Sequence, residues 1–272
     1  MWARASFSLK AGFVISATMG CIALLAPVLA PYDPYATNPT IILEAPSASH
    51  WLGTDSIGRD VFSRVIYGAR ASLSVAAAIS LISVGLGAIL GAASALAGGW
   101  IDTLAMRFAD VMLSLPALVI ALALSAVLGP NLTNLALILG TLGIPFFARI
   151  FRSEALSLSQ QNFIRSSRLL GGGFNHLLMG HIIPNLAPLL ATLLSHALST
   201  SLLAASALSF IGLGAQPPTA EWGALIYEGR NTLMFEWWCA IPPGITIAIS
   251  ATGFILLGDG LRDALDPRSE PQ

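Results

Sequence analysis

Polar and apolar residues occupy long separate blocks along this chain. The segments without any Asp, Glu, Lys or Arg are residues 11–32, 71–101, 111–148, 169–220 and 237–258. A helix needs about 20 apolar residues to cross the core of a bilayer, so the first, second and last segments each hold one span. The 111–148 segment holds two, because Gly129-Pro130-Asn131 divides it with a turn signal. The 169–220 segment ends in another span, from about Asn185 to Leu213, and the pattern predicts six transmembrane helices in an all-α membrane protein.

The composition supports this prediction and excludes a soluble protein. Of the 272 residues 55% are hydrophobic and only 10% are charged, and the mean hydropathy is +0.77. The first apolar run is longer than the core of a cleaved signal peptide, and Pro31 would directly follow the cleavage point. We therefore expect an uncleaved first span over residues 11–30. Cys21 and Cys239 show no pairing pattern and are expected to act as small apolar residues.

The basic residues predict the orientation of the spans. With the N-terminus inside, the inner segments hold Arg4, Lys10, Arg107, Arg149, Arg152, Arg165, Arg168, Arg262 and Arg268, and the outer segments hold Arg59, Arg64, Arg70 and Arg230. Cytoplasmic loops carry the excess of Lys and Arg, so both termini are predicted to be cytoplasmic. The expected organisation is a cytoplasmic N-terminus 1–10, the first span 11–30, an external loop 31–71, a five-helix core 72–258 that contains a cytoplasmic loop 151–185, and a cytoplasmic tail 259–272.

The external loop begins with a proline-rich stretch that cannot be helical. Towards its end, Val61 and Val65 alternate with Arg59 and Arg64 at helical spacing. This alternation predicts a short amphipathic helix at the outer membrane interface, before the second span. Such a helix either anchors the chain at the interface or helps to receive a partner that carries substrate.

The cytoplasmic loop contains an unusually polar island, residues 159–188. We expect a short helix from Ser159 to Leu170, which the glycines at 171–173 must end because glycine disfavours a helix interior. The residues that share one face of a second helix are Phe174, Leu177, Leu178, His181 and Ile182. Pro184 is expected to end that helix, because proline has no N–H for the next hydrogen bond. A folded loop of this kind predicts that another protein docks on it.

The fifth span is rich in hydroxyl groups. Its predicted pathway-lining residues are Ser195, Ser199, Thr200 and Ser206. Hydroxyls at this density indicate a face turned to a wet pathway or to neighbouring helices, although they could equally bond back to carbonyls of their own helix. His196 is expected to be neutral and hydrogen-bonded across the bundle, rather than a metal ligand or a proton relay.

No enzyme or metal site is expected in this chain. Its single lysine, Lys10, has no phosphate-binding GxxxxGK[ST] sequence around it, so no ATP site of its own is predicted. HExxH, CxxC and Ser-x-x-Lys sequences are absent, and the histidines lack partners at ligand spacing. We expect no catalytic residue, no cofactor and no bound metal.

Four stretches resemble a known family. Arg165-Ser166-Ser167, Gly171 and Pro184 stand at the positions of the Glu-Ala-Ala, glycine and proline of the short cytoplasmic motif of ATP-binding-cassette (ABC) permeases, although Arg165 replaces the Glu. The sequences RSSRLLGGG and HIIPN are similar to those of permeases in the dipeptide/oligopeptide/nickel import branch. So are WLGTD…GRD, SFIGLGAQPPTAEWGALI and GDGLRDALDPR. The resemblance covers roughly residues 30–268 and is closest to the second, C-type permease of the pair.

The resemblance implies a multi-pass permease of the bacterial cytoplasmic membrane that forms half of a pathway for peptides, nickel or a metal-chelate or opine-like solute. It implies as partners a homologous second permease, two ATP-binding subunits, an external substrate-binding protein and the lipid bilayer, with no nucleic acid. ATP would be bound by the partner subunits alone.

The family motif also implies roles for the loop residues. The expected charged contacts to an ATP-binding subunit are Arg165 and Arg168, beside Ser166 and Ser167. Leu169, Leu170 and Phe174 would be the apolar insert. Gly171 would allow the turn, and Pro184 would connect the loop rigidly to the fifth span. Contact of the two arginines with lipid phosphates is the alternative.

A secondary transporter or channel that is not driven by ATP is the alternative function. Such proteins typically carry carboxylates inside the membrane or broken helices in repeated halves. The predicted spans contain no Asp or Glu. A purely structural membrane protein would leave the folded loop unexplained.

Overall fold

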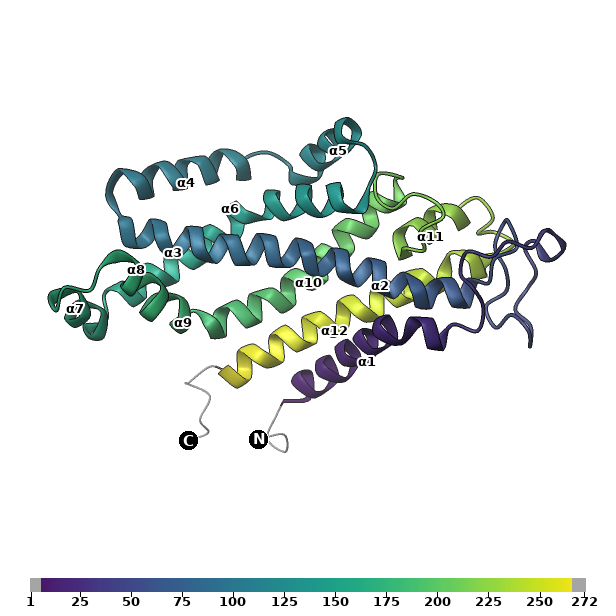
Figure 1. The fold of residues 1–272 in the computed structure, drawn as a ribbon, viewed down its shortest axis with the longest axis horizontal. Helices are drawn as coiled ribbons and strands as arrows, with labels where there is room; N and C mark the ends of the chain where they lie inside the picture. The colour runs from purple at the N-terminus through teal and green to yellow at the C-terminus, as the bar shows by residue number, and fades with distance from the viewer. Residues whose placement is uncertain (1–5, 266–272) are drawn as a thin grey trace.

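The computed structural model describes residues 6–265, and all the regular elements in that range are helical. Long helices run side by side along the longest dimension of the molecule (Figure 1). They are α1 (Phe7–Leu29), α2 (Val61–Ser80) with α3 (Gly87–Ala97), α6 (Leu132–Ser159), α10 (Ala187–Phe210) and α12 (Ile241–Leu265). Within the described range five helices are long and apolar enough to cross a membrane, and a bent helix pair raises the number to six. The all-α, multi-span prediction is confirmed.

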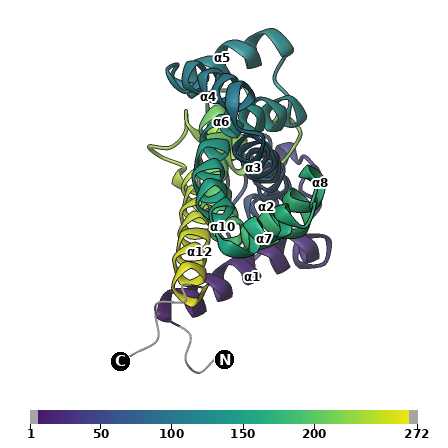
Figure 2. The same ribbon diagram turned by 90° about the vertical axis from the view of Figure 1, so that its left-hand side faces the viewer.

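The short elements gather at the two ends of the bundle. One end carries α7 (Asn162–Leu169), α8 (Phe174–Leu177) and α9 (Ile183–Asn185), and Figure 2 looks onto this end. We refer to it as the loop end. The start of α1 and the end of α12 also lie there (Figure 1). The opposite end carries the segment after α1 and α11 (Trp222–Gly229). Both ends of the described chain therefore share one side with the 159–188 loop, as the predicted topology requires.

The predicted interfacial helix before the second span is wrong. α2 begins at Val61 and continues through a π-helical segment, Leu81–Leu86, into α3, so that residues 61–97 form one span. The carboxylate of Asp60 starts this helix by accepting a hydrogen bond from the backbone N–H of Ser63 at 2.7 Å. The arginines that suggested a solvent-facing side are buried and ion-paired instead.

The third span differs from the expected helix over residues 111–128. Two helices, α4 (Gly99–Leu113) and α5 (Ala117–Leu128), meet at an angle of 82°. Pro116 stands at the break, because proline disfavours helix at the preceding residue and cannot donate to the previous turn. Both helices lie as a separate layer beside α3 and α6 (Figure 1). Ion pairs from Asp102 and Asp110 to Arg152 and Arg149 attach α4 to α6.

The fourth and sixth spans are both longer at their C-terminal ends than the sequence predicts. α6 extends the fourth span to Ser159, so the cytoplasmic loop predicted from 151 starts inside a helix. α12 continues through Gly258 to Leu265, so the first part of the predicted tail is helical. Arg4, Asp266 and Arg268 lie outside the described residues, as does the rest of the tail from 266 to 272.

Close helix contacts hold the bundle together. At Gly91 of α3, an added Cβ would stand 2.2 Å from the carbonyl oxygen of Ala148 in α6, so this contact requires glycine. Small residues four apart allow such close approach in lipid, and Gly87 makes a similar contact with Phe147 of α6. α1 packs along α12, and α10 packs between α12 and α2.

Candidate functional site

The 159–188 loop forms an elbow between α6 and α10. Its first helix, α7, starts at Asn162 and not at Ser159, because α6 occupies the preceding residues. The turn after α7 places Gly171 at a φ of +88°, a left-handed conformation that only glycine adopts without strain. The predicted break at the glycines is therefore confirmed.

The second half of the elbow corrects the role expected for Pro184. The helix that starts with α8 passes through a π-helical segment, Leu178–Ile182, and continues as α9 to Asn185, so Pro184 lies inside it. Local widening of the helix accommodates a ring that would otherwise clash with the preceding turn. The chain turns into α10 at Leu186, whose N–H donates to the carbonyl of Ile182 at 3.0 Å.

Buried apolar side chains fix the elbow to the bundle. Those packed in one cluster with α3 and α6 are Ile164, Leu177, Leu178 and Ile182. In addition, the hydroxyl of Ser167 in α7 lies 3.2 Å from Nε2 of His181 in the following segment. The two halves of the elbow are thereby held against each other and against α6.

The tip of the elbow is exposed and apolar. Leu169 is 88% exposed and Leu170 is 89% exposed. Arg165 and Arg168 are exposed beside them, as is Ser166, and neither arginine forms an ion pair within residues 6–265. Phe174 is 44% exposed and borders an apolar cavity of about 840 Å³ between α3, α4, α5 and α6. The structure thus exposes Leu169 and Leu170 beside the two predicted arginines, while Phe174 also borders the cavity.

The predicted pathway hydroxyls divide between two faces of α10. Ser195, Ser199 and Ser206 are buried, whereas Thr200 is exposed. Ser195 donates to the carbonyl of Ala191 at 3.0 Å, and Thr200 donates to that of Ala197 at 3.1 Å. Both therefore bond back to their own helix, which is the alternative that the sequence left open.

His196 lies on the exposed side of α10 and reaches across to α12. Its Nε2 lies 3.0 Å from Oδ1 of Asp259, and its Nδ1 lies 3.0 Å from the carbonyl oxygen of Thr192. The expected hydrogen bond across the bundle is confirmed. The partner was missed because Asp259 was placed in the tail, beyond the last span.

The residue before Asp259 is Gly258, and its small size allows the His196 ring to approach α12. An added Cβ at this position would stand 2.5 Å from Cε1 and Nδ1 of His196. The imidazole ring therefore rests directly on the backbone of α12. The sequence Gly258-Asp259-Gly260 contains a signal for this contact. An acidic residue there lies between two residues that are small enough for another helix to approach.

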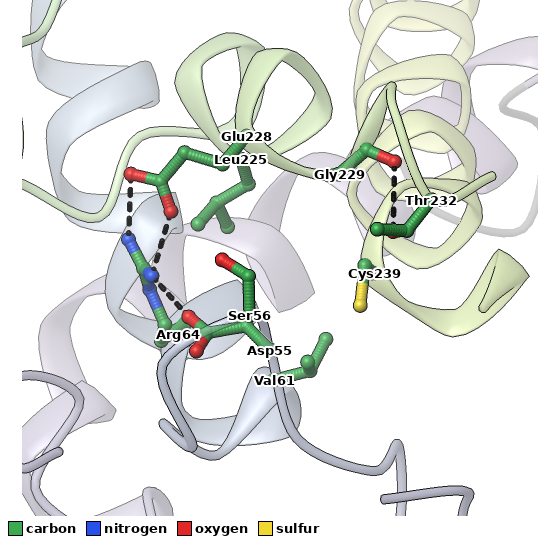
Figure 3. A pocket seen from close by; sticks show the side chains of 9 residues that line it. All are labelled: Asp55, Ser56, Val61, Arg64, Leu225, Glu228, Gly229, Thr232 and Cys239. Atoms are coloured by element: carbon green, nitrogen blue, oxygen red, sulfur yellow. Dashed lines mark hydrogen bonds and ion pairs between the residues drawn. The ribbon is translucent and has the colours of Figure 1, made fainter. Parts of the chain in front are cut away.

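A buried charge network lies at the opposite end of the bundle (Figure 3). Nη1 of Arg64 in α2 lies 2.6 Å from Oδ2 of Asp55 and 2.8 Å from Oε2 of Glu228 in α11. Arg59 makes the same two contacts, with Nε 2.6 Å from Asp55 and Nη2 2.5 Å from Glu228. Two positive and two negative groups balance, which is how buried charges are tolerated. The network connects the segment after α1 to α2 and α11.

The electrostatics of Asp55 follow from this arrangement. Burial alone would favour the neutral acid, but a hydrogen bond from the backbone N–H of Arg59 and the charges of Arg59 and Arg64 outweigh it and lower the pKa of Asp55 below 3.8. Glu221 and Trp222, at the start of α11, are also buried. Glu221 starts α11 by accepting from the backbone N–H of Ala224 at 2.9 Å.

Comparison with known proteins assigns this architecture to a family. Residues 83–271 match the family described as the binding-protein-dependent transport system inner membrane component. The chain belongs to this family. The matched range begins within the second span, extends through the last one and includes the whole elbow.

Individual relatives agree with the family. The chain is 42% identical over 256 residues to the probable D,D-dipeptide transport system permease protein DdpC of Escherichia coli strain K12, covering 94% of this chain and 86% of that protein. It is 40% identical over 260 residues to the dipeptide transport system permease protein DppC of Alkalihalophilus pseudofirmus, covering 94% and 84%. It is 40% identical over 250 residues to the glutathione transport system permease protein GsiD of Escherichia coli O1:K1, covering 91% and 82%.

These matches establish the general role of the chain. It is a permease subunit of an ABC importer and a protein of the bacterial inner membrane. The family consists of transport components and not of catalytic enzymes. A permease of such an importer works with a partner permease, an ATPase and a substrate-binding protein in general.

Proposed function

We propose that this permease carries a small peptide across the inner membrane and receives the movement of an ATPase subunit at Leu169 and Leu170. The observation that carries the proposal is the exposure of this leucine pair on an elbow that is otherwise firmly packed. Burial of one leucine side chain contributes about 1.5–3 kcal/mol. A partner that covers both leucines would therefore be held strongly at this point.

The surroundings of the leucine pair suit a protein partner. Arg165 and Arg168 flank it and are free to meet acidic groups, because they pair with no residue in the described part of the chain. In this proposal the loop end of the bundle faces the cytoplasm, and so do both termini. ATP is bound and hydrolysed by two partner subunits, and this chain needs no cofactor of its own.

Movement at the tip can reach the spans on both sides of the elbow. α7 follows α6 after two residues, and α9 leads into α10 through Leu186 alone. Ile164 and Ile182 share one cluster with α6, so the elbow cannot shift without moving the ends of α6 and α10. We propose that this coupled movement exposes the pathway to one side at a time, with a homologous second permease forming the other half.

The names of the relatives support a peptide as the solute. Two of the three relatives reported above are named for dipeptides and one for glutathione, all of which are small molecules with charged ends. Nickel and metal-chelate or opine-like solutes stay predictions from the resemblance. Thr200 is the exposed member of the predicted pathway hydroxyls, and we assign the pathway to that side of α10.

The test replaces the tip without disturbing the elbow. In the complete importer, Leu169→Glu with Leu170→Glu should abolish co-purification of the ATPase and ATP-driven uptake, while insertion and the amount of permease in the membrane stay unchanged. Leu169→Met with Leu170→Met keeps the surface apolar and should retain both properties. Full uptake in the Glu variant would exclude the leucine pair as the docking point.

A second measurement separates this function from transport without ATP. The purified chain alone in vesicles should not move Ala-Ala or any other small peptide down its gradient. Uptake by the chain alone would favour the channel or secondary transporter that the sequence left as an alternative.

A further inference from the structure

A cavity of about 620 Å³ opens at the loop end between α6, α10 and α12. Its volume is within the range of about 300–1,000 Å³ that small-molecule sites typically occupy. Apolar side chains of α10 and α12 form most of its wall: Pro188, Leu189, Leu193 and Leu265. Its remaining lining residues are polar or charged, and they come from all three helices: Glu154, Thr192, His196 and Arg262.

Glu154 and Arg262 are opposite charges that remain unpaired across this cavity. Both side chains are exposed, and neither has an ion-pair partner among residues 6–265. The contrast with the same part of α6 is clear, because Arg149 and Arg152 pair with Asp110 and Asp102 of α4. Glu154 lies on a different face of the helix from these arginines, since each residue advances the helix by about 100°. Glu154 and Arg262 therefore line the cavity without an ion-pair partner among the described residues.

The remaining ionisable group in the wall, His196, is already satisfied. Both of its ring nitrogens face acceptors at 3.0 Å, the carboxylate of Asp259 and the carbonyl of Thr192. Both ring nitrogens are therefore occupied within the bundle, and Glu154 and Arg262 are the charged lining groups that are left to contact a solute.

We infer that this cavity is a transient binding site for a zwitterionic solute, such as a small peptide with free ends, on its way out of the permease. Arg262 binds the carboxylate, for which its planar group is suited. Glu154 binds the ammonium group, and the leucines contact the side chains between them. The inference rests on the proposed function, because it deals with the solute that the pathway delivers to the loop end.

The opposite charges of Glu154 and Arg262 favour a zwitterionic solute over a metal cation or a purely anionic solute. A metal cation would be repelled by Arg262, and within the described residues no group of three His, Cys, Asp or Glu side chains is placed to hold one. A purely anionic solute would meet Glu154. Because both charged groups are partly solvated, binding is weak, and a solute can leave as readily as it enters, as conduction requires.

The experiment measures protection of one cavity residue from labelling. The importer carries Cys21→Ala and Cys239→Ala to remove its own thiols, and Leu193→Cys to place one thiol in the cavity wall. Inside-out vesicles without nucleotide are treated with a water-soluble maleimide in the presence of Ala-Ala. Ala-Ala should slow labelling at position 193, whereas N-acetyl-Ala-Ala-amide, which has neither charge, should not. A thiol from Trp100→Cys, which is exposed at the same end outside the cavity, should be labelled equally in all conditions.

The two charged residues are then removed singly in the Leu193→Cys background. Arg262→Gln should raise the half-protecting concentration of Ala-Ala by about tenfold, the effect of losing one charge-assisted contact. With this variant, Ala-Ala and its C-terminal amide should protect equally. With Glu154→Gln, Ala-Ala and its N-acetyl form should protect equally. Each variant thus removes discrimination at one end of the peptide only, which a general structural defect would not produce.

Two results would overturn the inference. One is equal protection by Ala-Ala and the doubly blocked peptide, and the other is unchanged protection in both variants. The failure of the proposed function is detected separately, because ATP-driven uptake of Ala-Ala by the unmodified importer is measured in the same membranes. Uptake without protection would reject the cavity site and leave the transport function intact.

Discussion

His196 of α10 and Asp259 of α12 face each other at 3.0 Å, although 63 residues separate them in the chain. The contact joins the helix that follows the elbow to the last span. It is possible because Gly258 allows the ring to lie against the backbone of α12. A movement that starts at the elbow therefore has a direct polar connection to α12, in addition to apolar packing.

The first prediction tests this connection. Gly258→Ala should displace the His196 ring and destabilise the protein by about 1–3 kcal/mol, as overpacking of a tight contact does. Its apparent Tm in detergent should fall and peptide uptake should decrease. Gly244→Ala, in the same helix, is the matched control, because the nearest atom to its new Cβ would be 3.8 Å away. Equal behaviour of the two variants would contradict the tight contact.

The second prediction concerns the turn at the elbow. Gly171→Ala forces a side chain into a left-handed conformation and should cost about 1–2 kcal/mol locally. This strain should weaken ATPase association and uptake, and Gly171→Asp should abolish both while membrane insertion survives. Gly173→Ala should be nearly silent, because Gly173 has an ordinary φ of −74° and open space around it. Normal transport by the Gly171→Asp variant would show that the elbow is not the docking element.

The third prediction concerns the buried charge network. Asp55→Asn leaves the two buried arginines, Arg59 and Arg64, with Glu228 as their single remaining carboxylate, and should destabilise the protein by about 3–5 kcal/mol, as breaking a buried pair typically does. Asp110→Asn removes an ion pair that is about half exposed and should cost less than about 1 kcal/mol. Apparent Tm values in detergent, compared at neutral pH, measure the difference.

The pH dependence of the same network has a defined sign. The native pKa of Asp55 is below the reference value of 3.8, so its stabilisation is complete above that value. It is lost as the pH falls through the lower native pKa. The difference in Tm between the unmodified protein and Asp55→Asn should be constant at neutral pH and narrow only below pH 3.8. A difference that narrows already between pH 7 and about pH 5 would contradict the lowered pKa.

The fourth prediction concerns topology. A reporter at either terminus, or one inserted at Gly172 between α7 and α8, should give a cytoplasmic signal, because α1 begins and α12 ends on the side of the bundle that carries the elbow (Figure 1). A reporter inserted near Ala48, in the segment between α1 and α2, should give an external signal. An external signal from the C-terminus would require an odd number of crossings and would reject the six-span arrangement.

Several features could be predicted from residues that are close together in the sequence. The apolar blocks gave the spans, because lipid requires long uncharged helices wherever they occur in a chain. The glycines at 171–173 predicted the turn at the elbow, because backbone freedom is a local property. The bend at Pro116 was missed, although proline was visible, since its neighbours were apolar enough to continue a straight span.

The sequence by itself determined that this chain is a multi-span membrane protein with a folded polar loop, because length, hydropathy and glycine act locally. Only the tertiary structure decided which polar groups meet. Arg64 joins Glu228 across 164 residues and His196 joins Asp259 across 63, while Glu154 and Arg262 are left facing a cavity. The physical reason is that ion pairs depend on which helix faces pack together, and packing is set by shape complementarity along whole helices rather than by neighbours in the chain.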